Sequence, residues 1–119
     1  MDLSGSNITI NNKRIKDFNI AAADTYIQTR LDTGFNINIR PNNSFDGNVI
    51  IARKTVDEAD NAKFSLIRRI TAAELADNEA IYDFAAGTIS LAVGIDAVGY
   101  TTGDIDVDIY SETYQPEEP

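Results

Sequence analysis

Three aspartates that alternate along one segment near the C-terminus are the side chains of this chain best suited to chemistry. Asp104, Asp106 and Asp108 are separated by Ile105 and Val107, so in a strand their carboxylates project from one face about 6–7 Å apart. Carboxylates at this spacing could bind a hard cation such as Ca²⁺. The alternative is a solvent-facing row of charges that blocks edge-to-edge pairing of strands. We favour this alternative and assign no metal ligands.

The other residue types that catalyse reactions form no recognisable motif. The acidic segment 57–61 lacks the spacing of an EF-hand loop, and no glycine-rich phosphate-binding string occurs. Glycosidase chemistry needs two carboxylates at a set separation, and nothing marks one pair among the 19 acidic residues. The chain has no histidine and no cysteine, which removes the usual general base at neutral pH and the thiol nucleophile. We therefore predict that the protein is not an enzyme, with no catalytic residues and no cofactor.

A short basic stretch is the candidate partner-binding site. Lys13, Arg14 and Lys16 form the densest group of positive charges, and Phe18 follows them. On an otherwise acidic protein these residues could dock onto an acidic partner surface. An ordinary solvated segment would have the same composition, and the residues alone leave both interpretations open.

Alternation of apolar and polar residues predicts the elements that must carry these groups. A period of two indicates strands with one face on a core and one face in water. Thr71 and Glu74 have the spacing of a capping box, which predicts a loop or a single helical turn. The segment 89–98 is the most apolar and is expected to be a central strand. We predict strands over residues 6–10, 25–31, 35–40, 48–54, 64–70, 89–98 and 105–109.

The turn spacing between these segments is typical of a single all-β domain, an antiparallel β-sandwich. The chain has 119 residues, enough for one such domain without a disulfide or a metal. We predict three parts: an N-terminal arm over residues 1–20, the sandwich over 21–112 and an acidic tail over 113–119. The arm lacks a core-sized apolar set of its own, so we expect it to order against a partner or a neighbouring subunit.

Charge is distributed unevenly along the sequence. The net charge is −9, with ten basic and eight acidic side chains in residues 1–70 but no basic and eleven acidic ones in residues 71–119. An acidic half repels phosphate backbones, so we expect no nucleic-acid partner. No apolar run is long enough to span a membrane, and no signal peptide is recognisable at the start. We expect the basic part to dock and the acidic part to face solvent.

Four short strings give the chain a resemblance to a known group of proteins. They are Asp24-Thr25-Tyr26, Gly34-Phe35-Asn36-Ile37, the segment from Gly47 to Arg53 and the segment from Gly99 to Val107. In their order and types they resemble small β-sandwich proteins encoded among the structural genes of tailed bacteriophages. The position that holds an aromatic-rich loop in those proteins is occupied here by residues 54–61, which contain no tryptophan.

The resemblance implies a virion component that binds the assembled capsid as a decoration, or cement, protein. It implies the major capsid protein or other virion proteins as partners, a homo-oligomer in the particle and location in the virion. A structural protein of the head–tail neck or of the tail is the first alternative. A carbohydrate-binding module on the virion surface is the second, although the chain lacks tryptophan, the side chain best suited to stacking on sugars.

Overall fold

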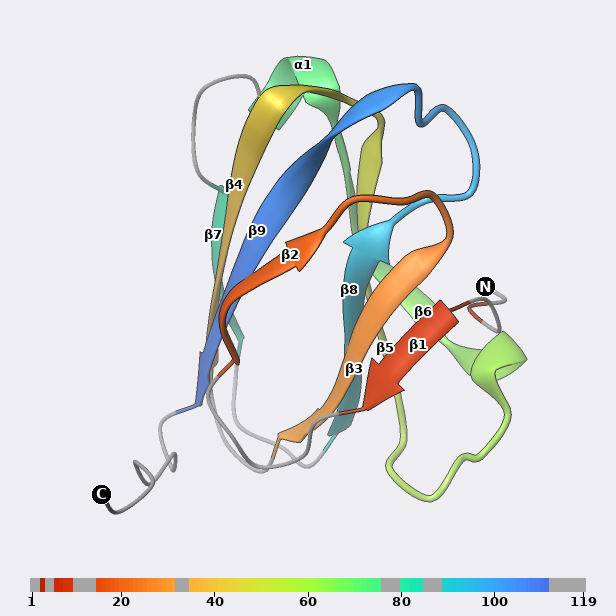
Figure 1. Cartoon of the computed structure of the whole chain (residues 1–119). Helices are drawn as coiled ribbons and strands as arrows, with labels where there is room; N and C mark the ends of the chain where they lie inside the picture. The colour runs from red at the N-terminus through yellow and green to blue at the C-terminus, as the bar shows by residue number, and fades with distance from the viewer. Residues whose placement is uncertain are drawn as a thin grey trace.

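Two β-sheets packed face to face form the molecule (Figure 1). The structure is a computed structural model that describes residues 3, 6–9, 15–31, 35–75, 80–84 and 89–111. It contains β1 (Ser6–Thr9), β2 (Ile15–Ile20), β3 (Thr25–Leu31), β4 (Phe35–Asp46), β5 (Asn48–Lys54), η1 (Asn61–Lys63), β6 (Ser65–Thr71), α1 (Ala72–Leu75), β7 (Ala80–Phe84), β8 (Ile89–Ile95) and β9 (Thr102–Ser111). None of the helices in this described part is long and apolar enough to cross a membrane.

Each sheet combines strands from both halves of the chain. The five-stranded sheet has the order β1-β3-β8-β5-β6, and the four-stranded sheet has the order β2-β9-β4-β7. All pairs are antiparallel except β1 with β3, which is parallel. The expected all-β sandwich is therefore confirmed, and β8 is the central strand of its sheet as predicted.

The core lies between the inner faces of the two sheets. Its side chains occupy alternate positions of the strands, as Ile105, Val107 and Ile109 do in β9, all at most 1% exposed. Leu75 of α1 closes one end of this core. Thr71 and Glu74 form the predicted capping box, because the Thr71 amide donates to Glu74 Oε1 and the Glu74 amide donates to Thr71 Oγ1.

The described strands of the predicted arm, β1 and β2, belong to the two sheets of the sandwich. β2 is an edge strand of the four-stranded sheet and pairs with β9, and its Ile15 and Ile20 are buried in the core. The sandwich thus begins before residue 21, because these apolar side chains complete its inner face. The predicted tail, residues 113–119, lies outside the described residues.

Two segments predicted to be turns or strand ends are built differently. The segment 41–44, expected to close a strand at Arg40, is a bulge within β4, where Asn43 and Ser44 have φ of 54° and 58° and the pairing with β9 shifts register. The strand expected to reach Val98 ends at Ile95, and Val98 is 71% exposed in the following loop. The bulge lets β4 continue past the end predicted at Arg40, whereas β8 ends three residues earlier than its apolar pattern predicts.

A close approach between strands fixes one glycine. A Cβ on Gly94 of β8 would lie 2.0 Å from the Thr25 carbonyl oxygen and 2.7 Å from the Tyr26 Cα. No other residue type fits there without a shift of the backbone. Gly94 therefore allows β3 and β8 to pair closely within their sheet.

Candidate functional site

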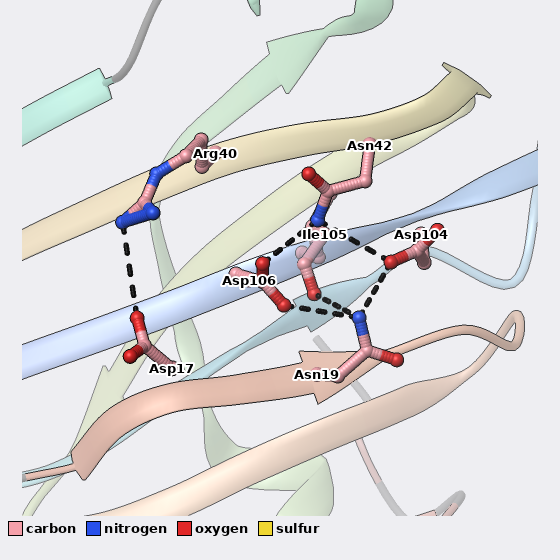
Figure 2. Close-up of polar contacts among 7 residues, drawn as sticks. All are labelled: Asp17, Asn19, Arg40, Asn42, Asp104, Ile105 and Asp106. Atoms are coloured by element: carbon pink, nitrogen blue, oxygen red, sulfur yellow. Dashed lines mark hydrogen bonds and ion pairs between the residues drawn. The ribbon is translucent and has the colours of Figure 1, made fainter.

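An asparagine–aspartate cluster on the outer face of the four-stranded sheet is the densest polar group in the described structure. It consists of Asn19 on β2, Asn42 and Asn43 on β4, and Asp104 and Asp106 on β9. The strand order β2-β9-β4 places the aspartates between two strands that carry the asparagines. Figure 2 shows Asn19 and Asn42 approaching the two carboxylates from opposite sides.

The amide groups donate hydrogen bonds to the carboxylates. Asn19 Nδ2 lies 2.5 Å from Asp104 Oδ2 and 3.0 Å from Asp106 Oδ1. Asn42 Nδ2 lies 2.8 Å from Asp106 Oδ2 and 3.3 Å from Asp104 Oδ2. Asn43 Nδ2 donates to Asp104 Oδ1 at 2.6 Å. The cluster therefore links three strands through charge-assisted hydrogen bonds.

These hydrogen bonds set the ionisation of Asp104. Hydrogen bonds from Asn43 first, and then from Asn19 and Asn42, favour the ionised carboxylate and lower the pKa of Asp104, while desolvation opposes them. Asp104 is thus held as an anion at neutral pH. Nearby, Arg40 and Asp17 form an ion pair at 3.9 Å (Figure 2), with both side chains about half exposed, a geometry that contributes little.

The predicted row of three aspartates is only partly brought together. The alternation itself is confirmed, since Asp104, Asp106 and Asp108 lie outward and half-buried while the residues between them are buried. Asp104 and Asp106 share amide partners, whereas Asp108 lies further along β9 opposite Asn38. Among the described residues, no group of three or more acidic, histidine or cysteine side chains could hold a metal ion.

As built, the cluster presents amide nitrogens to the carboxylates. A hard cation is bound by oxygen ligands, so the three amides would have to turn their oxygens inward to help bind one. The hydrogen bonds of the cluster hold β2 and β4 to β9.

The predicted partner-binding residues fall in different environments. Lys13 and Arg14 lie outside the described residues. Lys16 is exposed on β2, whereas Phe18 is half-buried and packs against the core. Asp17, with φ of 51°, sits in a bulge that shifts the register between Ile15 and Phe18, and this shift turns both apolar side chains inward.

The shifted pKa values found in the described structure do not suit catalysis. The pKa of Glu74 is lowered, first by the hydrogen bond from the Thr71 amide, and that of Asp104 is lowered as described above. Burial raises the pKa of Tyr26 to about 12, helped by the nearby charges of Asp24 and Asp96. These carboxyls remain ionised and this phenol remains neutral, so none of the three resembles a general acid or base poised near pH 7.

Sequence reasoning missed the three asparagines. The predicted strand 35–40 ends before Asn42 and Asn43, and Asn19 lies within the predicted arm, residues 1–20. The signal that could have found them is the outward register: Asn19 pairs with Asp106 and Asn42 pairs with Asp104 across neighbouring strands. The register of Asn19 follows a bulge between Ile15 and Phe18 that the sequence pattern does not reveal, whereas Asn42 continues the regular register of β4 with β9.

The acidic loop 57–61 has a local structural role. Asp60 Oδ1 accepts a hydrogen bond from the Ala62 amide at 2.9 Å and caps η1, and Glu58 accepts one from the Asp60 amide. These contacts order the turn before Phe64.

Comparison with known proteins gives distant structural likenesses, among them a collagenase domain and a lysozyme inhibitor. No protein-family model matches the chain, and no curated protein sequence matches it. The pre-peptidase C-terminal domain of a collagenase from Bacillus anthracis is 15% identical, with a TM-score of 0.47, 89% of this chain covered and 96% of that one. PliG, a periplasmic inhibitor of g-type lysozyme from Salmonella Typhimurium, is 13% identical, with a TM-score of 0.39, 90% of this chain covered and 100% of that one. Neither likeness is close enough to carry an inference about the activity of this chain.

Proposed function

We propose that the protein is a structural, non-catalytic component of a tailed-bacteriophage virion and that it binds the assembled capsid as a decoration protein. The observation that carries the proposal is the way the strings behind the resemblance meet in space. Three of the four strings converge at one end of the sandwich, where β3, β5 and β9 begin.

Hydrogen bonds link two of these strings through the residues that flank them. The Thr101 amide donates to the Asp46 carbonyl at 2.8 Å, and the Thr101 hydroxyl donates to Asp46 Oδ2. Asn48 Nδ2 donates to the Val98 carbonyl, and the Asp96 amide donates to the Asn48 carbonyl. The loop before β5 and the loop before β9 are therefore one structural unit.

Tyr100 connects the third string to this unit. Its hydroxyl lies 2.7 Å from the Gly103 carbonyl oxygen and 3.0 Å from the Ala21 carbonyl oxygen, in the loop that leads to Asp24. A Cβ on Gly103, which has φ of 86°, would lie 2.4 Å from the Phe45 Cα. Three of the four strings thus pack together at one corner of the sandwich. This supports an architecture shared with the phage proteins that the chain resembles more strongly than unconnected matches would.

The exposed side chains also fit a protein that acts through contacts. Tyr110 is exposed, at 41%, and one exposed ring by itself offers no extended platform for stacking on sugars. A carbohydrate-binding role therefore gains no specific support.

The test is the composition of purified phage particles. Particles of the phage that encodes the chain should contain it, and cryo-EM should place many copies over the shell. A single ring of copies at the neck or tail would support the alternative structural role. Absence from particles, when the chain is present in the same lysate, would overturn the proposal.

A charge-reversal pair tests the docking residues. We expect Lys16→Glu to weaken binding to particles, because it places a negative charge in the basic stretch. Arg53→Glu, an equal charge change at an exposed site on the other sheet, is the matched control. Equal binding of the Lys16→Glu variant and the unaltered protein would remove Lys16 from the interface.

A further inference from the structure

The outer face of the five-stranded sheet is apolar at its centre. Ile50 and Ala52 of β5 and Ala92 of β8 point to this face, and each is 0% exposed. In a two-layer sandwich the outer face is ordinarily solvated and polar. Other parts of the chain must therefore cover this outer face, because the four-stranded sheet packs against the inner face.

Two separate pieces of chain supply the cover. Phe64, 1% exposed, follows η1, and the loop before it is held by Lys54 Nζ, which donates to Asn61 Oδ1 at 2.7 Å and lies 4.8 Å from the Phe64 ring centre. Leu3, also 1% exposed, fills the rest of the cluster, and its amide donates to the Asn61 carbonyl at 3.1 Å. We call the outer-face cluster without Leu3 the socket: Tyr26, Ile50, Ala52, Phe64 and Ala92.

The segment that carries Leu3 is attached to the sheet as an added strand. β1 lies at the sheet edge, pairs with β3 over four residues, from Ser6 opposite Thr25 to Thr9 opposite Gln28, and is the parallel member of an otherwise antiparallel sheet. A strand hydrogen-bonded to a sheet edge with an apolar side chain in a socket is the geometry by which extended segments bind other proteins.

We propose that the socket and the β3 edge are a docking site for the N-terminal segment, Leu3 and β1, of a second copy of the chain. The segment already seated there shows that the site fits this sequence. Exchange between copies replaces each contact by an identical one, so it costs little free energy apart from association. The next strand, β2, lies in the four-stranded sheet. Leu3 and β1 can therefore leave the five-stranded sheet without removing another strand from it.

Refolding at high concentration followed by light scattering tests the proposal. We expect the full chain to form dimers, and Leu3→Asp to raise the dimer dissociation constant about tenfold or more, because the carboxylate cannot enter the socket. Val98→Asp, which alters an exposed apolar residue of another loop, is the matched control and should leave dimerisation unchanged. A full chain that stays monomeric at every concentration would overturn the proposal.

Two further experiments separate this proposal from the alternatives. Leu66 is 44% exposed on the edge strand β6, so dimers lost in Leu66→Asp but kept in Leu3→Asp would place the interface there instead and overturn the proposal. A labelled peptide of residues 1–9 should bind the Leu3→Asp chain, whereas the same peptide with Leu3→Asp should not. Equal binding, or no binding, of the two peptides would contradict the socket. The result is independent of whether phage particles contain the protein.

Discussion

Thr29 has a buried hydroxyl group that makes no hydrogen bond with the described residues. Its side chain is 0% exposed, and Oγ1 has no hydrogen-bond partner among the described residues. Thr29→Val keeps the shape and removes the desolvated group, so we expect the free energy of unfolding to rise by about 1 kcal/mol, measured by urea denaturation. Thr25→Val is the control: Thr25 Oγ1 donates to the Ala23 carbonyl at 3.2 Å, so that variant should gain nothing. A loss of stability in Thr29→Val would show that its hydroxyl is bonded.

Asp104 should make stability depend on acid pH. Hydrogen bonds from Asn43 and Asn19 lower its folded-state pKa, below about 3.9 for an unfolded aspartate. The stabilisation is therefore complete above the unfolded pKa and is lost as pH falls through the folded pKa. We expect Asp104→Asn to flatten the decline of unfolding free energy below about pH 4, measured by denaturation over a pH series. Asp57→Asn, at an exposed loop residue, controls for removal of one charge, and equal slopes in the two variants would contradict the assignment.

For individual residues, the sequence predicted the direction of a side chain better than its hydrogen-bond partners. The outward placement of Asp104 and Asp106 follows from alternation alone, because a strand has a period of two. The asparagines that bind them come from strands distant in sequence: Asn19 follows the bulge at Asp17, Asn43 lies in the bulge of β4, and Asn42 pairs in the regular register just before it. Such registers depend on tertiary packing, which no local pattern encodes.

The pairing of β3 with β8 depends on the lack of a side chain at Gly94. We expect Gly94→Ala to lower the free energy of unfolding by about 1–3 kcal/mol or more, because the new methyl would meet backbone atoms of Thr25 and Tyr26. Gly47→Ala, whose Cβ would lie 3.1 Å from the Phe45 ring and 3.3 Å from the Tyr100 Cα, should cost less, because both contacts are longer than the 2.0 Å contact at Gly94. Chemical denaturation compares the two. A Gly94→Ala variant as stable as the unaltered protein would show that β3 and β8 lie further apart.

The three-strand cluster should hold without a metal ion. Its carboxylate oxygens already accept hydrogen bonds from amides, so we expect millimolar Ca²⁺ to change Tm by less than about 1 °C, measured by thermal denaturation against a chelator-treated sample. Asp104→Asn is the control. A rise of several degrees in the unaltered protein but not in this variant would show that the amides turn their oxygens toward a bound cation.

Elements were predictable where one face is apolar and the strand is regular. β3, β5 and β8 follow from their patterns, and the single turn of α1 follows from Thr71 and Glu74. The end of β4 was not predictable, because its Pro41 and its asparagines carry turn signals while hydrogen bonding to β9 carries the strand through a bulge. Neighbouring strands overrode local preference there.

For the whole molecule, composition predicted the fold class but not the distribution of charge in space. The basic and acidic parts of the sequence do not form two opposite surfaces. Lys16 and Arg40 share the four-stranded sheet with Asp104 and Asp106, because each sheet takes strands from both parts of the chain. The expected division into a docking half and a solvent-facing half therefore does not describe the surface of this sheet.

The position of β9 between β2 and β4 has a consequence for synthesis. A ribosome releases a chain from its N-terminus at about 5–20 residues per second, so β2 and β4 leave the exit tunnel well before β9, which ends at Ser111. Neither strand has its β9 partner until then, and the apolar inner face of that sheet stays open. The four-stranded sheet, and with it the sandwich, can therefore close only after β9 has emerged. Until then the growing chain is exposed to aggregation or chaperone capture.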